Sequence, residues 1–307
     1  MIPTAEVELR QGKTTKKATA RLDTGMNGTY VMVPKTMADE LGIVATGKEI
    51  QNTIDGPKEV LVGKLDLVRL VGLETCSLAN GKVTIGGDQV WLGQPFLAAT
   101  GAAILYLEGR PALMCSGNAS SAVGVFPQFS FDIIHKNRRQ TVTGIVDTGF
   151  YGGLGLPPDI AGLLGLQANS KVEVQTPSGK KEVGVTTVDR LIFSGHPKCG
   201  VDNVETVLLP ADAPFKAVIV GEKFLSTMPG NSAIEYVKNG VIAVCGADES
   251  VIQAAKTVYL AIVRPEDLPS DVQPALIVTD QGSPSWIPWA IAGVAAAGIA
   301  GWLIFKR

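Results

Sequence analysis

Apolar and polar residues alternate in short segments along most of the chain, beginning with Ile2 to Leu9. Alternation with a period of two is typical of strands with one buried face. Valine and threonine are frequent in these segments, and both residues favour strands. The pattern predicts an all-β protein with strands near residues 2–9, 65–73, 82–85, 89–92, 102–107, 129–134, 140–146, 204–209 and 217–220, and with short helices at 34–41, 158–166 and 222–227.

Turn-forming residues divide three further segments into predicted β-hairpins. Residues 50–61 turn around Ile54-Asp55-Gly56-Pro57, and residues 172–185 turn around Pro177-Ser178-Gly179. Residues 233–244 turn around Lys238-Asn239-Gly240. Lysines at positions 13, 16 and 17 are expected to mark an exposed turn after the first strand.

An Asp-Thr-Gly motif follows an apolar segment at Asp147-Thr148-Gly149. A single copy is weak evidence of function, because Asp and Thr often hydrogen-bond their own backbone in ordinary turns. The same three residues occur a second time, at Asp23-Thr24-Gly25, again after an apolar segment.

The two motifs belong to a longer internal repeat. Aligning the aspartates also aligns Gly28 with Gly152 and Pro34 with Pro158, and three later segments match in the same order: 41–43 with 164–166, 56–60 with 179–183, and 91–97 with 219–225. A repeat this long indicates a duplicated domain. We expect a first lobe at residues 1–118 and a second at 119–247, joined through the small polar residues 116–121.

Composition argues against several classes of function. The net charge is −2 and no basic run is present, so nucleic acid is not an expected partner. The two histidines, His135 and His196, are far from other ligand-type residues in the sequence, and no Cys-x-x-Cys motif occurs. We therefore expect no metal, no other cofactor and no Ser-His-Asp triad.

The chain changes character after residue 247. Residues 248–285 are expected to form an extension and a tether, since positions 265–284 are rich in Pro, Asp and Ser. Residues 286–305 contain no charged side chain and carry tryptophans near both ends, which predicts one transmembrane helix in a lipid bilayer. Gly293, Ala297 and Gly301 recur every fourth residue, and this is either a helix–helix dimer face or plain lipid-facing filler.

The membrane side of the lobes stays open. The amino terminus has no apolar run, which leaves no visible cleavable signal and favours cytoplasmic lobes. Lys306 and Arg307 follow the predicted span, and positive charge tends to stay inside, which favours lobes on the outer side.

Each half of the chain resembles a retropepsin-like (retroviral-type) aspartic protease lobe. The resemblance covers about four fifths of the chain and rests on three features that occur twice: an apolar strand into Asp-Thr-Gly, a glycine-tipped hairpin, and a late apolar-apolar-Gly segment. It implies two tandem lobes that each supply one catalytic aspartate, Asp23 and Asp147. Such a pair shares one proton and activates a water molecule for peptide hydrolysis.

The resemblance also implies roles for neighbouring residues. Thr24 and Thr148 are expected to hydrogen-bond across a pseudo-two-fold axis. Gly25 and Gly149 are expected to let their N–H groups approach the carboxylates. The hairpins are expected to act as flaps that close on an extended peptide, through Ile54, Asp55, Gly56, Ser178 and Gly179. In the first lobe Met26-Asn27 replace the small residues usual in the family, so its site is expected to be less well organised.

These features leave three functions open. The first is a membrane-anchored aspartic endopeptidase. The second is a catalytically weak peptide-binding module at the membrane, and the third is a protease that cleaves only its own tether. The presence of both aspartates favours an enzyme.

Four cysteines occupy equivalent places in the repeat. Cys76 and Cys199 follow the two hairpins, and Cys115 and Cys245 end the last strand of each lobe. This symmetry suggests the pairs Cys76–Cys115 and Cys199–Cys245. The sequence slightly favours the alternative, four buried thiols inherited by duplication, because free cysteine packs well in protein cores.

Overall fold

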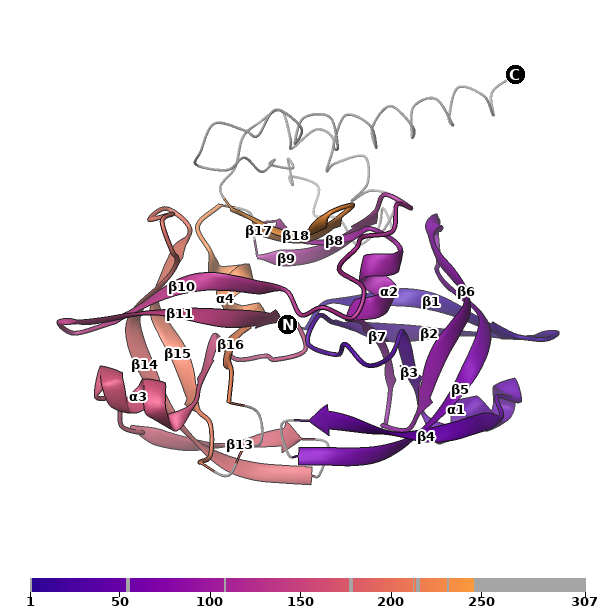
Figure 1. The fold of residues 1–307 in the computed structure, drawn as a ribbon, viewed down its shortest axis with the longest axis horizontal. Helices are drawn as coiled ribbons and strands as arrows, with labels where there is room; N and C mark the ends of the chain where they lie inside the picture. The colour runs from indigo at the N-terminus through magenta and orange to yellow at the C-terminus, as the bar shows by residue number, and fades with distance from the viewer. Residues whose placement is uncertain are drawn as a thin grey trace, which may run out of the picture.

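The computed structural model describes residues 2–245 except 54–55, 108, 177–178, 212, 214–215 and 231. The described chain is mostly β, with two barrel-like lobes and only four short helices. Figure 1 shows the lobes on either side of the molecule, with the first and second halves of the described chain in separate lobes.

The first lobe contains a seven-stranded sheet in the order β1-β2-β7-β3-β6-β5-β4. Strand β1 also pairs with β5, so the sheet closes on itself into a barrel-like lobe. Two short helices, α1 (Lys35–Leu41) and α2 (Gln94–Ala99), follow strands of this sheet. The strands are β1 (Thr4–Gln11), β2 (Thr14–Asp23), β3 (Val31–Val33), β4 (Ala45–Thr53), β5 (Gly56–Leu70), β6 (Leu73–Ile85) and β7 (Val90–Gly93).

The second lobe repeats this plan element by element. Its sheet has the order β10-β11-β16-β12-β15-β14-β13, with β10 also pairing with β14. Helices α3 (Pro158–Leu164) and α4 (Glu222–Thr227) occupy the places of α1 and α2. The strands are β10 (Gln128–His135), β11 (Arg138–Asp147), β12 (Leu154–Leu156), β13 (Ser170–Thr176), β14 (Gly179–Phe193), β15 (Gly200–Leu208) and β16 (Val218–Gly221).

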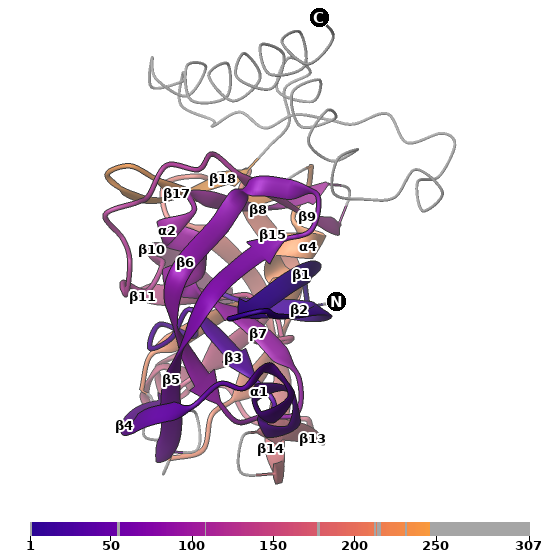
Figure 2. The same ribbon diagram turned by 90° about the vertical axis from the view of Figure 1, so that its right-hand side faces the viewer.

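A third, four-stranded sheet joins the lobes in the order β18-β17-β8-β9. It combines the last hairpin of the first lobe with the last hairpin of the second, and β8 pairs antiparallel with β17. Figures 1 and 2 show this sheet along one side of the molecule. Its strands are β8 (Ala102–Leu107), β9 (Arg110–Cys115), β17 (Ser232–Val237) and β18 (Gly240–Cys245).

One hydrophobic cluster runs through both lobes and the shared sheet. Alternate residues enter it, as expected for strands with one buried face: Val7 and Leu9 from β1, and Phe131 and Ile133 from the equivalent strand β10, are fully buried. Tyr106 of β8 and Tyr236 of β17 belong to the same cluster. The lobes are therefore packed together through a common apolar interior.

Most predicted elements lie where the alternation placed them, but several differ in extent. The strand at 102–107 and the helix at 222–227 have the predicted bounds. Strand β5 runs unbroken from Gly56 to Leu70, where two separate strands were expected. Lys16 and Lys17 lie within β2 and the turn is at Gly12-Lys13, because β1 and β2 extend as a hairpin with solvent-exposed polar positions at that end.

The sequence alignment of the two halves was wrong by one residue after the motifs. Pro34 precedes α1 as its N-cap residue, and its structural counterpart before α3 is Pro157, not Pro158. Strands β3 and β12 are displaced in the same way, since Val31 and Leu154 both begin a three-residue strand. The loop after Gly149 is one residue shorter than the loop after Gly25.

The predicted tether and membrane span, residues 248–285 and 286–305, lie outside the described residues. Among the residues that are described, no helix is long and apolar enough to cross a membrane. The span and the proposed lobe boundaries therefore stay predictions.

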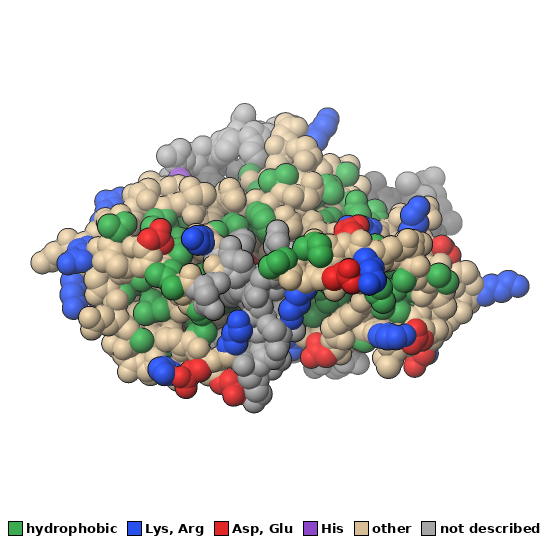
Figure 3. Space-filling view, turned by 60° about the horizontal axis from the view of Figure 1, so that its bottom comes forward, with side chains coloured by type: hydrophobic (Ala, Val, Ile, Leu, Met, Phe, Trp, Pro, Cys, Tyr) green, Lys and Arg blue, Asp and Glu red, His purple; other side chains and the backbone are tan. Residues whose placement is uncertain are grey.

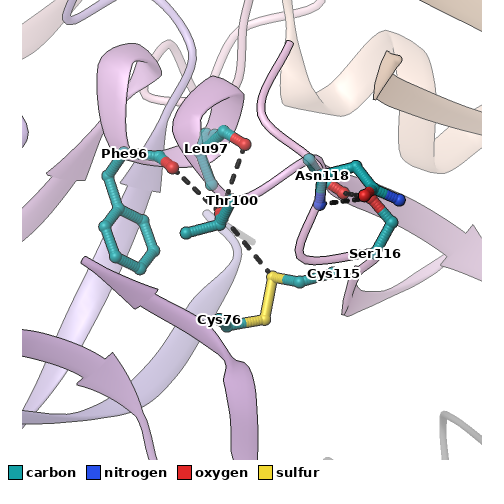
Figure 4. The surroundings of a disulfide bond; sticks show 8 residues. Cys76, Phe96, Leu97, Thr100, Cys115, Ser116 and Asn118 are labelled. Atoms are coloured by element: carbon teal, nitrogen blue, oxygen red, sulfur yellow. Dashed lines mark hydrogen bonds between the residues drawn. A yellow bond between two sulfur atoms is a disulfide. The ribbon is translucent and has the colours of Figure 1, made fainter. Parts of the chain in front are cut away.

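The structure pairs all four cysteines of the sequence, Cys76 with Cys115 and Cys199 with Cys245. The Cα–Cα distances are 5.5 and 5.7 Å, within the roughly 4.4–6.8 Å range of disulfides. Figure 4 shows the first pair beside α2, where the Thr100 hydroxyl donates to the Phe96 carbonyl at 2.9 Å and lies 3.8 Å from Cys115 Sγ. Each disulfide therefore ties the last strand of a lobe to the lobe's own sheet.

These disulfides predict that protein denatured without reductant contains no free thiol. Replacing Cys76 with serine should expose one thiol and lower the free energy of unfolding by about 4 kcal/mol, because a closed loop of this length restricts the unfolded chain. The double variant Cys76→Ser, Cys115→Ser should lose no more stability than the single one. Four free thiols in the unreduced protein would exclude the pairing.

Candidate active site

Asp23 and Asp147 occupy equivalent strand ends. Asp23 is the last residue of β2 and lies opposite Gly93 of β7, while Asp147 is the last residue of β11 and lies opposite Gly221 of β16. Both pairs of strands are parallel and lie inside their sheets. Each aspartate therefore lies at the end of a strand that is hydrogen-bonded to a neighbour on both sides, and this fixes the position of its backbone.

The threonines of the two motifs connect the lobes directly. The Thr24 N–H donates to Thr148 Oγ1 at 3.2 Å, and the Thr148 N–H donates to Thr24 Oγ1 at 3.0 Å. Each hydroxyl then donates to a carbonyl of the opposite lobe, Thr24 to Val146 at 2.7 Å and Thr148 to Leu22 at 2.8 Å. Both side chains are fully buried. Four reciprocal hydrogen bonds in a water-free setting hold the two strand ends together.

The glycines of the motifs allow each lobe to approach the other's aspartate. A Cβ atom at Gly149 would lie 2.6 Å from the Asp23 carboxyl carbon, and a Cβ atom at Gly25 would clash in the same way with the Asp147 carboxylate. No other residue type fits at either position without moving a carboxyl group. The two aspartates are therefore close across the lobe boundary, each against the other motif's backbone.

Backbone donors hold both carboxylates. The Gly25 N–H donates to Asp23 Oδ1 at 2.8 Å, and the Gly149 N–H donates to Asp147 Oδ1 at 2.8 Å. Asp147 Oδ1 also accepts from the Phe150 N–H at 3.2 Å. Each aspartate keeps some contact with solvent although its carboxyl group lies deep among protein atoms.

Burial and proximity alter the protonation of the pair. Burial raises the pKa of Asp23 well above its ordinary value, and the neighbouring Asp147 carboxylate raises it further. Burial also raises the pKa of Asp147, but hydrogen bonds from Asp23 and from the Gly149 and Phe150 N–H groups oppose that rise. Both shifts favour a pair that keeps one proton between the two carboxyl groups, and the two groups titrate as one unit.

Two glycines at this site were not recognised as site residues from the sequence. A Cβ at Gly221 would meet the Phe150 carbonyl oxygen at 2.5 Å, and a Cβ at Gly93 would meet the Met26 carbonyl oxygen at 2.6 Å. Each glycine lets the loop after an aspartate fold back over the neighbouring strand. In the sequence, both glycines end a repeated apolar-apolar-Gly segment. The distance of that segment from the aspartates along the chain did not indicate that the two lie side by side.

The two predicted flap hairpins are present as paired backbone. Gly56 begins β5 opposite Thr53, and Gly179 begins β14 opposite Thr176. In Figure 1 both hairpins extend from their lobes toward the middle of the molecule. Ile54, Asp55 and Ser178 lie outside the described residues.

The hairpins present apolar side chains to solvent. Ile50 of β4 is 65% exposed and Val172 of β13 is 41% exposed. Figure 3 views the molecule from the hairpin side, where apolar and charged side chains are interspersed over both lobes.

Within the described parts of the chain, no group of three or more His, Cys, Asp or Glu residues is placed to hold a metal ion.

Comparisons with known proteins add little to this geometry. No protein-family model matches the chain, and no curated protein matches it. Among solved structures, the chain is similar to the crystal structure of a retropepsin-like aspartic protease from Rickettsia conorii, with 16% sequence identity over 38% of this chain and 80% of that one, and a TM-score of 0.27.

The raised pKa values of the aspartates predict how stability depends on pH. The folded state keeps a proton that the unfolded chain releases near pH 4, so stability is greatest below that pH and falls as the pH rises through the raised pKa. Asp147→Asn removes one of the two ionisable carboxyl groups, and with it the repulsion between them. It should raise the unfolding free energy at pH 7 on the order of 1 kcal/mol, or about 2 to 4 °C in melting temperature, with little gain near pH 3.

The matched control for this prediction is Asp88→Asn, at an exposed aspartate outside the site. Thermal melts of both variants between pH 3 and pH 8 provide the measurement. An Asp147→Asn variant that is less stable than the wild type at pH 7, or that follows the control at every pH, contradicts the raised pKa values.

Proposed function

We propose that this protein is an aspartic endopeptidase, in which an Asp23/Asp147 dyad activates water to hydrolyse peptide bonds. The observation that carries the proposal is the pair of carboxyl groups, within hydrogen-bond reach of each other and each supplied by a different lobe. Chemistry of this kind needs one protonated and one ionised carboxyl group side by side. Burial, which raises the pKa of both carboxyl groups, and their proximity favour a pair that keeps one proton.

The two aspartates take different roles in the proposed reaction. Backbone N–H donors favour the ionised form of Asp147. Asp147 accepts a proton from the water molecule while the water oxygen bonds to the peptide carbonyl carbon. Asp23 gives its proton to the carbonyl oxygen, which yields a tetrahedral diol. Asp147 then passes the proton to the leaving nitrogen as the C–N bond breaks, and Asp23 recovers its proton from a diol hydroxyl. The pair ends as it began, so no covalent intermediate is needed.

The substrate of this proposal is an extended segment of a peptide or protein. Hairpins β4–β5 and β13–β14 present strand-like backbone at the side of the molecule seen in Figure 3. Extended peptides bind such hairpins by pairing with them as an additional strand. Gly56 and Gly179, next to the tips, suit a close backbone approach.

The buried acid pair favours an enzyme over a catalytically weak peptide-binding module. Two carboxyl groups pressed together reduce the stability of the folded protein at neutral pH. Peptide pairing along the hairpins does not require that arrangement. Proteins keep such unfavourable groups mainly at sites where they take part in chemistry.

We also propose that residues 286–305 anchor the enzyme in a membrane, with the lobes on an oxidising side. The anchor rests on the uncharged twenty-residue segment of the sequence. The side rests on Cys76–Cys115 and Cys199–Cys245, because disulfides persist in oxidising compartments. The two basic residues after the span agree with this orientation.

Cleavage of a peptide library by the purified protein tests the proposed activity. Asp23→Asn and Asp147→Asn should each abolish turnover, and the double variant should be no worse than either single one, because the two groups act as a unit. Asp88→Asn is the matched control and should retain turnover. Binding of the same peptides without any cleavage by the wild type would instead indicate the binding module.

Extraction of membranes with alkaline carbonate tests the proposed anchor. The full-length chain should stay with the membrane pellet, and a variant lacking residues 286–307 should be released into the soluble fraction. Protease added to intact cells should digest the lobes if they are on the outer side. Full-length protein found entirely in the soluble fraction would remove the anchor from the proposal.

A further inference from the structure

The connection between the lobes is held on both sides. We define the interlobe connection as residues 116–127, between β9 and β10. The Ser120 N–H donates to the Ala98 carbonyl of α2 at 2.8 Å, in the first lobe. The Ser120 hydroxyl donates to the Gly240 carbonyl at 2.7 Å and the Ser121 N–H to the Lys238 carbonyl at 3.0 Å, in the second lobe. Within the interlobe connection, Ser120 and Ser121 are thus hydrogen-bonded to both lobes.

Both polar groups of the Gln94 amide bond to this connection. Its side chain is fully buried at the start of α2. The amide Nε2 donates to the Ala122 carbonyl, and the amide Oε1 accepts from the Gly124 N–H at 2.8 Å. The Ala122 carbonyl accepts and the Gly124 N–H donates, so a side chain that bonds to both must offer a donor and an acceptor, as glutamine does.

The same residue also holds the loop that follows Asp23. The backbone N–H of Gln94 donates to the Met26 carbonyl at 2.8 Å. Gln94 directly follows Gly93, the residue that lies opposite Asp23 in the sheet. The Tyr236 hydroxyl from the second lobe lies near the Gln94 amide, although no hydrogen bond of good geometry joins them. Gln94 is therefore where the Asp23 loop, the interlobe connection and the second lobe meet.

The second lobe has a glutamate at the equivalent place. Glu222 begins α4 after Gly221, is likewise buried, and donates its N–H to the Phe150 carbonyl at 3.0 Å. The backbone role is therefore common to both lobes, and the side-chain amide that bonds to the interlobe connection is present in the first lobe. An ionised carboxylate at position 94 could accept from Gly124 but could not donate to Ala122.

We propose that Gln94 is a positioning residue that transmits the placement of the interlobe connection to the Asp23 loop, and so aligns the two carboxyl groups. Only the expected effect on kcat rests on the proposed function. The interlobe connection then does more than join the two lobes: through Gln94 it helps to hold the loop that follows Asp23. Loss of the amide should shift Asp23 relative to Asp147 without touching either residue.

The test compares Gln94→Met, which keeps the length of the side chain, with Gln94→Glu in the full-length protein. Gln128→Met and Gln128→Glu, at an exposed glutamine, are the matched controls. Gln94→Met should lower kcat about tenfold or more with KM changed less than about threefold, and should shift the pH profile of stability that the dyad creates. Amide hydrogen exchange in residues 120–125 should become at least about tenfold faster. Both controls should match the wild type.

Gln94→Glu keeps the inference falsifiable if Gln94→Met does not fold. A protonated glutamate can donate to Ala122, so the variant should match the wild type in exchange and kcat at acidic pH. As the carboxyl group ionises, exchange in residues 120–125 should become faster than in the wild type and kcat lower. Faster exchange with an unchanged kcat and an unchanged pH profile of stability would reduce Gln94 to a structural role and overturn the proposal. If the wild type cleaves no peptide, the proposed function fails, and the exchange and pH–stability measurements still decide whether Gln94 aligns the two aspartates.

Discussion

The reciprocal hydrogen bonds between Thr24 and Thr148 are the constraint on which the rest of the structure depends. They join the ends of β2 and β11, strands from different lobes, through donors and acceptors that are wholly removed from water. A buried hydrogen bond that is broken leaves its groups unsatisfied, so the lobes cannot drift apart by small steps. The position of each aspartate relative to the other follows from this joint.

Holding two carboxyl groups together opposes folding, and the surrounding structure offsets that opposition. The shared sheet β18-β17-β8-β9 and the apolar cluster that crosses the lobe boundary stabilise the joined state. Gly25 and Gly149 leave room for the opposite carboxyl group, and backbone N–H groups satisfy the charge that remains on Asp147. The same surroundings favour a pair that keeps one proton, which is what the proposed hydrolysis needs.

Much of this arrangement could be predicted from the sequence, because it leaves periodic or repeated signals. The alternation located most strands, and the duplicated motif pointed to Asp23 and Asp147. Other features left no such signal. Strands β3 and β12 are only three residues long, too short for a period, and their one-residue displacement hid the match between Pro34 and Pro157. Gln94 could not be recognised, because its importance comes from Ala122 and Gly124, which lie about thirty residues away in the chain. The cysteine pairs were suggested by symmetry, and only the fold could choose between them and buried thiols.

The central claim is that Asp23 and Asp147 share one proton across the lobe boundary. NMR titration of the protein with aspartate carboxyl carbons labelled with ¹³C tests this most directly, with the two signals assigned from the Asp23→Asn and Asp147→Asn variants. The account predicts that both signals respond together to each titration step, and that Asp23 keeps its proton well above the ordinary aspartate pKa of about 3.9. Two independent titrations near that ordinary value would contradict it.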